Sequence, residues 1–376
     1  MTPTVPLGRW FGVPVGLHYS WFIVAWLITM SLGLQLEFQN PTWTMAVVWT
    51  TATITALLFF IGLLLHELSH AAVARLHGIP VRGITLFALG GVARIERDAA
   101  SPGLEFAIAI AGPVASVVIG GVCDAAAALL GWSAGAPAPS PLAALLGWLG
   151  YINIALALFN LIPGFPLDGG RVFRAGVWAV TKDADRATRI AAGTGQAIAI
   201  AFILFGLTVV FVRSDFGGLW LAFIGWFLLE AARSNYVASQ VLARLRGLSV
   251  ADLMVRDCAD VDPDRTVQEF VDHELVPNPG ACFVVRRSGQ PIGLVSAEDV
   301  ARTPPGRRSA LTVSDVIQPI DADHSVTPEM PASAALELMN RRHVTELPVL
   351  DHGHLEGVVA QMHILRRLRL QAALRG

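Results

Sequence analysis

The chain has 376 residues, of which 54% are apolar and only 15% are charged, whereas a soluble domain carries about a quarter of charged residues. This composition excludes an ordinary soluble protein of that length. The formal net charge of −2 at pH 7 argues against a nucleic-acid partner. The three cysteines, Cys123, Cys258 and Cys282, are scattered and predict neither a disulfide framework nor a cysteine metal site.

The distribution of charge divides the chain. Charged residues are sparse up to about residue 236 and ordinary in frequency after it, which predicts a membrane domain over residues 1–237, a linker over 238–247 and a soluble part beyond. After a short lead, residues 1–17, six apolar stretches are long enough for a membrane helix of about 20 residues. They cover approximately residues 18–36, 44–72, 104–130, 142–161, 190–212 and 219–232. His18 begins the first stretch, and its isolated place there predicts a residue at the membrane interface rather than a functional one.

The second stretch ends in the sequence His66-Glu67-Leu68-Ser69-His70. Residues four apart lie on one face of a helix, so the two histidines can direct their imidazoles at one point. With one further ligand they leave a zinc ion an open position for water, and Glu67 can take a proton from that water. Ionisable groups near a bilayer core cost roughly 2.5–3.5 kcal/mol each. Three of them so close together favour a metal site over buried histidines that are merely hydrogen-bonded.

Residues 81–95 follow the motif and are rich in β-branched side chains with partial alternation of polarity. Gly90 and Gly91 interrupt them, which predicts a short β-hairpin. Such a hairpin could offer an open strand edge to an extended peptide, or it could be a plain connection.

The fourth stretch ends in a segment from Asn160 to Arg171 in which two prolines and three glycines must break the helix. A carboxylate is what a two-histidine zinc site lacks, so Asp168 is the candidate third ligand. Its alternative role is an N-cap for the segment from Arg171 onward. Asn160 could donate a hydrogen bond to a substrate backbone or a developing oxyanion, or it could satisfy the broken helix.

Arginine and lysine residues gather after the second, fourth and sixth stretches. The loops after the first and third carry none, and the loop after the fifth carries only Arg213. Because cytoplasmic loops hold an excess of these residues, both termini are predicted to be cytoplasmic. The histidine motif then lies within the bilayer toward its cytoplasmic side.

The soluble part contains a duplication with an offset of about 64 residues. Residues 250–254 (VADLM) resemble 313–317 (VSDVI), and residues 293–300 (GLVSAEDV) resemble 357–364 (GVVAQMHI). Each copy, at residues 248–309 and 310–376, is predicted to run strand, helix, strand, strand, helix.

A pair of such units can form a ligand cleft. Ser296 and Asp299 follow an apolar strand at a helix start in the first copy, where the hydroxyl and the carboxylate could hold a ribose. The equivalent Ala360 and His363 cannot do so in the same way, so any ligand site is asymmetric or vestigial. A pure dimerisation or scaffold role is the alternative.

The HELSH sequence at the end of a membrane helix, with Asn160, Pro163 and Asp168-Gly169 on a later broken helix, resembles the site-2 protease family of intramembrane zinc metalloproteases. This resemblance covers about residues 8–236. The tail resembles a tandem pair of CBS (cystathionine-β-synthase-type) domains over about residues 248–370. Together they imply a polytopic α-helical membrane protein with six transmembrane helices and a short membrane-associated β-sheet, followed by an α/β tandem CBS domain pair.

The resemblance also implies the chemistry. One Zn²⁺ per chain would be bound by His66, His70 and Asp168, with Glu67 as the general base. The substrates would be single-pass membrane proteins, cut in or beside their span and received as a strand by residues 81–95. The CBS pair would sense an adenine nucleotide and form a homodimer.

Two functions are therefore compared. The leading one is a zinc-dependent intramembrane endopeptidase of the cell membrane, modulated by its CBS pair, with substrate contacts from Asn160, Gly90 and Gly91. The alternative is a CBS-regulated membrane transporter or channel, because broken helices and acidic groups at membrane depth also occur in transporters. A transporter has no need of Glu67 beside two histidines on one helix face, and the stretches show no obvious inverted repeat.

Overall fold

The structure is a computed structural model that describes residues 5–88, 90–95, 99–133, 137–245, 247–278, 280–321, 324–342 and 344–364, without the side chains of 235–244. It divides into two compact units, residues 1–237 and 238–376. Each unit is described by itself.

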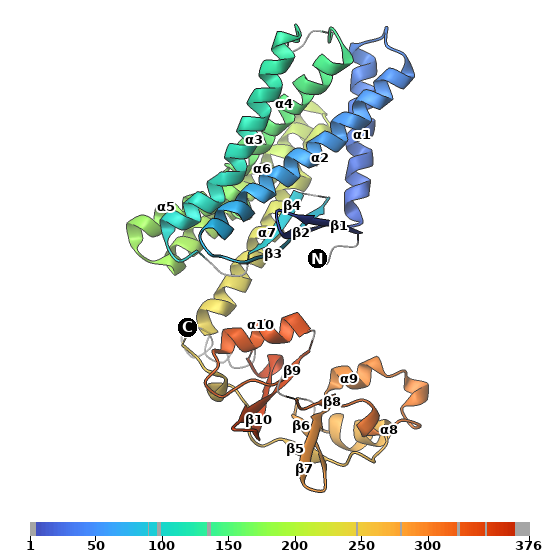
Figure 1. The fold of residues 1–376 in the computed structure, drawn as a ribbon, viewed down its shortest axis with the longest axis vertical. Coiled ribbons are helices and arrows are strands. Elements are labelled where there is room, and N and C mark those ends of the chain that lie inside the picture. The colour runs from blue at the N-terminus through green and yellow to red at the C-terminus, as the bar shows by residue number, and fades with distance from the viewer. Residues whose placement is uncertain are drawn as a thin grey trace. The chain divides into compact units, whose positions relative to one another are not determined.

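The first unit is built on long helices that Figure 1 labels in chain order. They are α1 (Ser20–Gln39), α2 (Met45–Leu76), α3 (Pro102–Leu129), α4 (Pro141–Asn160), α5 (Asp168–Thr181), α6 (Ala184–Arg213) and α7 (Gly217–Leu245). The side chains of Thr44, Ser101 and Ser140 accept hydrogen bonds from backbone N–H groups of the first turns of α2, α3 and α4. Such caps satisfy donors that a helix start leaves without a partner. Residues 238–245, which we expected in a linker, continue α7.

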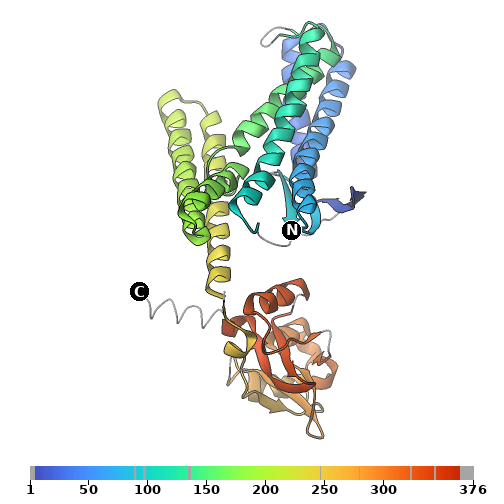
Figure 2. The same cartoon turned by 60° about the vertical axis from the view of Figure 1, so that its left-hand side comes forward.

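Five of these helices, α1, α2, α3, α4 and α6, are long and apolar enough to cross a membrane. They correspond to the first five predicted spans. The sixth predicted span lies in α7, which is not among the candidate helices found in the described part of the chain, and the count of six stays a prediction. Figure 2 shows α6 and α7 running side by side. They approach closely because Gly206 faces the backbone of Ala222 and Gly225 faces that of Ile203.

A four-stranded sheet lies against α2. Its order is β1 (Val5–Trp10), β2 (Val13–Leu17), β3 (Val81–Phe87), β4 (Gly90–Ile95), with β2 and β3 parallel and the other pairs antiparallel. The predicted hairpin is confirmed as β3 and β4, whereas β1 and β2 in the lead segment were not predicted. Apolar side chains from both parts of the chain, such as Val15 and Ile84, pack with Leu64 and Leu68 of α2. The sheet therefore sits beside the histidine motif.

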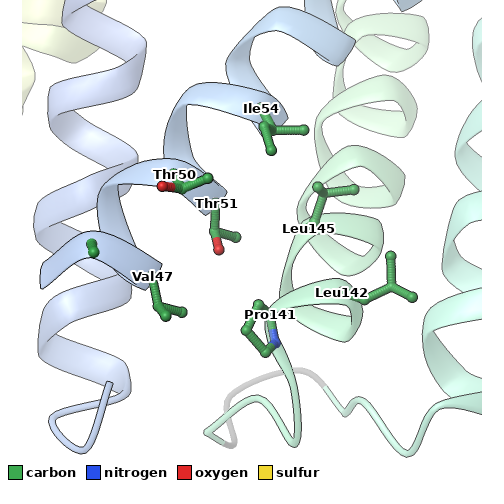
Figure 3. Close-up of a pocket in the computed structure, with 8 residues that line it drawn as sticks. Val47, Thr50, Thr51, Ile54, Pro141, Leu142 and Leu145 are labelled. Atoms are coloured by element: carbon green, nitrogen blue, oxygen red, sulfur yellow. The ribbon is translucent and has the colours of Figure 1, made fainter. Parts of the chain in front are cut away.

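An apolar groove of about 480 Å³ lies between the beginnings of α2 and α4 (Figure 3). Val47, Thr51 and Leu145 are among its lining residues, and none of the side chains that line it is titratable. Thr51 precedes His66 by 15 residues in the same helix, which separates them by about 22 Å. This groove is thus distant from the histidines and offers no group for catalysis.

The second unit has the predicted order in its first copy: strand, helix, strand, strand, helix. The elements are β5 (Ala259–Val261), α8 (Val267–Phe270), β6 (Phe283–Arg287), β7 (Gln290–Leu294) and α9 (Ala297–Arg302), followed by β8 (Gln318–Pro319), α10 (Ala332–Arg342), β9 (Glu346–Asp351) and β10 (His354–Ala360). In the second copy, a single parallel bridge between Val326 and Val349 replaces the first strand. Buried Cys282, Val284 and Leu294 of the first copy pack with Val358 of the second, so the copies share a core.

The prediction that the cysteines form no disulfide is wrong, because Cys258 and Cys282 are bonded. Strand β5 runs parallel to β6 with Ala259 opposite Phe283. The residues that precede this pair are therefore neighbours, with their Cα atoms 4.9 Å apart. A pairing between strands has no signature in the spacing of two cysteines.

Candidate active site

His66 and His70 of α2 converge with Asp168, the first residue of α5. The Nε2 atoms of the two imidazoles lie 3.1 and 3.2 Å from Oδ2 of Asp168. All three potential ligand atoms lie within 4.8 Å of one another, and both histidines are buried. Ligand atoms about 2.0–2.2 Å from a tetrahedral zinc ion are ~3.4 Å apart, so the three atoms have the spacing of a zinc site.

Helix α3 orients both imidazoles through contacts with their Nδ1 atoms. Nδ1 of His70 lies 2.6 Å from the backbone carbonyl oxygen of Ile108, and Nδ1 of His66 lies 2.9 Å from Oγ of Ser116. A carbonyl oxygen can only accept, so Nδ1 of His70 donates and its Nε2 keeps a lone pair for a metal. Neither of these two partners was predicted from the sequence. The carbonyl oxygen of Ile108 is a backbone group and has no signature in the sequence.

Gly112 of α3 lies directly opposite the two Nε2 atoms. A Cβ atom at this position would lie 2.2 Å from Nε2 of His70 and 2.5 Å from Nε2 of His66. These are close to metal–nitrogen bond lengths of about 2.0–2.1 Å. The absent side chain of Gly112 therefore leaves a space beside both Nε2 atoms, at about the distance of a zinc–nitrogen bond.

Glu67 is half-buried beside the two histidines and contacts β4. A Cβ atom at Gly91 would lie 2.4 Å from Cγ and 2.8 Å from Oε1 of Glu67. The second strand of the hairpin thus lies against the predicted base. Gly91 is required there because only glycine allows this close approach.

These groups line a cavity of about 550 Å³ within the first unit. Gly90 and Asn160 also line it. Nδ2 of Asn160 donates to the backbone carbonyl oxygen of Leu156, 3.1 Å away, which is the helix-satisfying alternative that the sequence left open. Arg171 lines the cavity as well, and no role was predicted for it from the sequence. The apolar wall includes Phe223 of α7.

The broken segment before α5 fixes the start of that helix. Gly169 packs against the backbone of Leu161, and Gly170 packs against the backbone of Gly164. Asp168 does not act as an N-cap, because the N-cap position is Leu167 and α5 begins at Asp168 itself. His18 lies outside the site, and its Nδ1 is 2.8 Å from Oγ of Ser20 at the start of α1.

Ser296 and Asp299 form a local capping box in the second unit. Oγ of Ser296 donates to Oδ2 of Asp299 over 2.6 Å, and the backbone N–H of Ser296 donates to the same oxygen over 2.9 Å. The same motif begins three other short helices, at Ser249, Thr266 and Thr312. This capping role was not predicted, although a Ser or Thr followed three residues later by an acid is its signature.

Comparison with known proteins identifies both parts of the chain. Residues 54–133 and 126–206 match the model of Peptidase family M50, and residues 250–306 and 313–370 match that of the CBS domain. The relative named zinc metalloprotease Rip3, from Mycobacterium tuberculosis, is 35% identical over 340 residues, 90% of this chain and 86% of the relative. A relative from Synechocystis, also named a zinc metalloprotease, is 32% identical over 376 residues, 99% of this chain and 97% of the relative.

Among solved structures, the site-2 protease from Methanocaldococcus jannaschii is 28% identical with a TM-score of 0.42, over 62% of this chain and 94% of that chain. The two relatives named zinc metalloproteases are similar to this chain over nearly its whole length. This likeness favours the peptidase over the transporter or channel. The chain belongs to Peptidase family M50, the site-2 protease type of zinc metalloprotease, and carries a tandem pair of CBS domains.

Proposed function

We propose that the chain is an intramembrane endopeptidase of the plasma membrane that hydrolyses peptide bonds in or beside the transmembrane segment of single-pass membrane proteins. The observation that carries this proposal is the convergence of two histidines and Asp168 beside Glu67, on helices that adjoin or cross the apolar part of the unit. A metal site for a soluble substrate has no need of such surroundings.

We assign one zinc ion per chain to His66, His70 and Asp168. When bound, zinc supplies a Lewis acid that activates water and polarises a carbonyl group. Glu67 accepts the proton of the attacking water, and the carbonyl oxygen takes up the electron pair of its π bond. When the C–N bond breaks, Glu67 returns the proton to the leaving nitrogen. The backbone at Gly91 packs against the carboxylate and holds it in place for both transfers.

The substrate is proposed to bind as a strand beside β4. In the described sheet β4 is an edge strand, because the order is β1-β2-β3-β4. An extended peptide can add to such an edge through main-chain hydrogen bonds. Gly90, Gly91 and Asn160 line the cavity next to it and are the proposed substrate contacts. The substrate helix must unwind first, since its carbonyl groups are otherwise hydrogen-bonded within the helix.

The remaining assignments follow from sequence. We propose six membrane spans, both termini in the cytoplasm, and domains at residues 1–237, 248–309 and 310–376. The CBS pair is proposed to bind an adenine nucleotide near Ser296 and Asp299, to form a homodimer and to modulate cleavage. The capping box uses Oδ2 of Asp299. The other carboxylate oxygen, Oδ1, lies 4.0 Å from Arg302. One carboxylate oxygen is therefore left for a ribose hydroxyl.

The test is co-reconstitution of the full chain in liposomes with a panel of single-span membrane proteins. Wild type should contain about one zinc per chain and release fragments cut in or beside the span. Glu67→Gln should keep the metal and stop cleavage, whereas His66→Ala should lose the metal. Zinc-loaded wild type that cuts no membrane-spanning protein but does cut soluble polypeptides would contradict the intramembrane assignment.

A further inference from the structure

Arg171 lies one turn after the predicted ligand Asp168 in α5. Residues three apart are neighbours on one helix face, with Cβ atoms about 5–6 Å apart. Arg171 is half-buried and lines the same cavity as His66 and Glu67. Arg171 therefore lies at the wall of the space in which a substrate would be cut.

Arg171 has no hydrogen bond or ion pair with any residue that the structure describes. Arg174, three residues further along α5, has the charged and polar partners that a buried arginine usually has. Its Nη1 lies 2.5 Å from Oε1 of Glu105, and its Nε donates to Oγ1 of Thr188 over 2.7 Å. A cation without a partner near a bilayer core is costly, so its retention indicates a function.

The other titratable and amide side chains of the cavity are already engaged. His66, His70 and Asp168 converge on the metal position, and Glu67 is the proposed base. Asn160, for which the sequence left an oxyanion role open, donates one amide N–H to the carbonyl oxygen of Leu156. Arg171 retains all five N–H donors, in a fork that suits an oxygen with negative charge.

We propose that Arg171 is a catalytic residue that binds the carbonyl oxygen of the scissile peptide bond and stabilises its negative charge after water attacks. The proposal deepens the proposed function and rests on it. A donor of this type gains most of its effect as charge develops, and its removal typically lowers kcat by about 10²–10³. The loss should therefore fall on kcat more than on KM.

The first experiment measures binding to full-length, zinc-loaded protein in detergent. One probe is a phosphinic peptide, whose tetrahedral anionic group imitates the attacked carbonyl, and the other is acetohydroxamate, which needs only the metal. Arg171→Ala should keep its zinc and bind the phosphinic peptide about 100-fold more weakly, with unchanged affinity for acetohydroxamate. Arg171→Lys should lie between. Arg189→Ala, at an exposed arginine of α6, is the matched control and should bind both probes as wild type does.

The second experiment measures cleavage of a single-span protein that the wild type cuts. Arg171→Ala should lose kcat by about 10²–10³, and added guanidinium should restore part of it. The inference is overturned if Arg171→Ala binds the phosphinic peptide with unchanged affinity or loses its zinc. Cleavage by wild type would still support the proposed function in that case. A wild type that binds zinc but neither probe overturns both.

Discussion

Replacing Gly112 by alanine should weaken zinc binding without altering any ligand. The new methyl group would lie 2.2 Å from Nε2 of His70 and 2.5 Å from Nε2 of His66, where the zinc ion is expected. Altering an outer partner of a metal site costs about 10–100-fold in affinity. A methyl group in the coordination sphere itself should cost more, so we expect zinc binding at least ~100-fold weaker than in wild type.

The assay is zinc stoichiometry and affinity of detergent-purified protein, measured by competition with a chelator. Gly121→Ala is the matched control, since it makes the same change on the same helix, at an exposed position where a Cβ atom meets nothing within 4 Å. This control should bind zinc as wild type does and keep or slightly raise the melting temperature, because alanine favours a helix by about 1 kcal/mol over glycine. If Gly112→Ala folds and holds zinc with wild-type affinity, the metal does not lie between Gly112 and the two histidines.

Three further predictions follow from contacts around the site and from the tail. Glu105→Gln should weaken zinc binding about 10–100-fold, because the ion pair with Arg174 holds α5, and with it Asp168, against α3. Competition with a chelator measures this affinity, and excess zinc should restore cleavage. Gly91→Ala should abolish cleavage while zinc content stays near one per chain, because its Cβ atom would displace the Glu67 carboxylate. Burial, and then the nearby Asp299 carboxylate, raise the pKa of Glu346 from its ordinary 4.5 to about 7. The free energy of unfolding of the tail should therefore fall by up to about 3 kcal/mol as the pH rises from 4.5 to 7, and Glu346→Gln should remove that dependence.

The sign of the last effect follows from proton binding. Between these two pH values the folded tail holds the Glu346 proton and the unfolded chain does not, so raising the pH favours unfolding. Thermal melts of the full chain across this range measure it. A tail transition that is equally stable at pH 5 and pH 7.5, or a Gly91→Ala variant that cuts at the wild-type rate, would contradict the contacts from which these predictions come.

The convergence of His66, His70 and Asp168 could be predicted because it depends largely on local patterns in the sequence. The spacing of His66 and His70 places both on one face of α2, and the proline and glycine pattern marks the break before Asp168. The contribution of α3 could not be found in this way. The carbonyl oxygen of Ile108 is a backbone group, and the need for glycine at position 112 depends on a helix that is distant in sequence.

Long-range pairing limited the prediction of the fold in the same manner. Strand β2 pairs in parallel with β3, which begins some 64 residues after it, with Val15 opposite Ile84. No local pattern in the lead segment announces that partner. The disulfide between Cys258 and Cys282 likewise depends on the pairing of β5 with β6. The duplication and the hairpin were accessible because each repeats or alternates within a short window.

The two imidazoles of the site are secured against mutation in different ways. His70 is oriented by the main chain at Ile108, so no exchange of the side chain at that position can remove the acceptor. His66 depends on the single hydroxyl of Ser116, which one substitution abolishes. The orientation of His70 therefore depends only on the path of α3. The orientation of His66 depends on one side chain, so a point mutation at Ser116 can change the metal affinity without disturbing the helices.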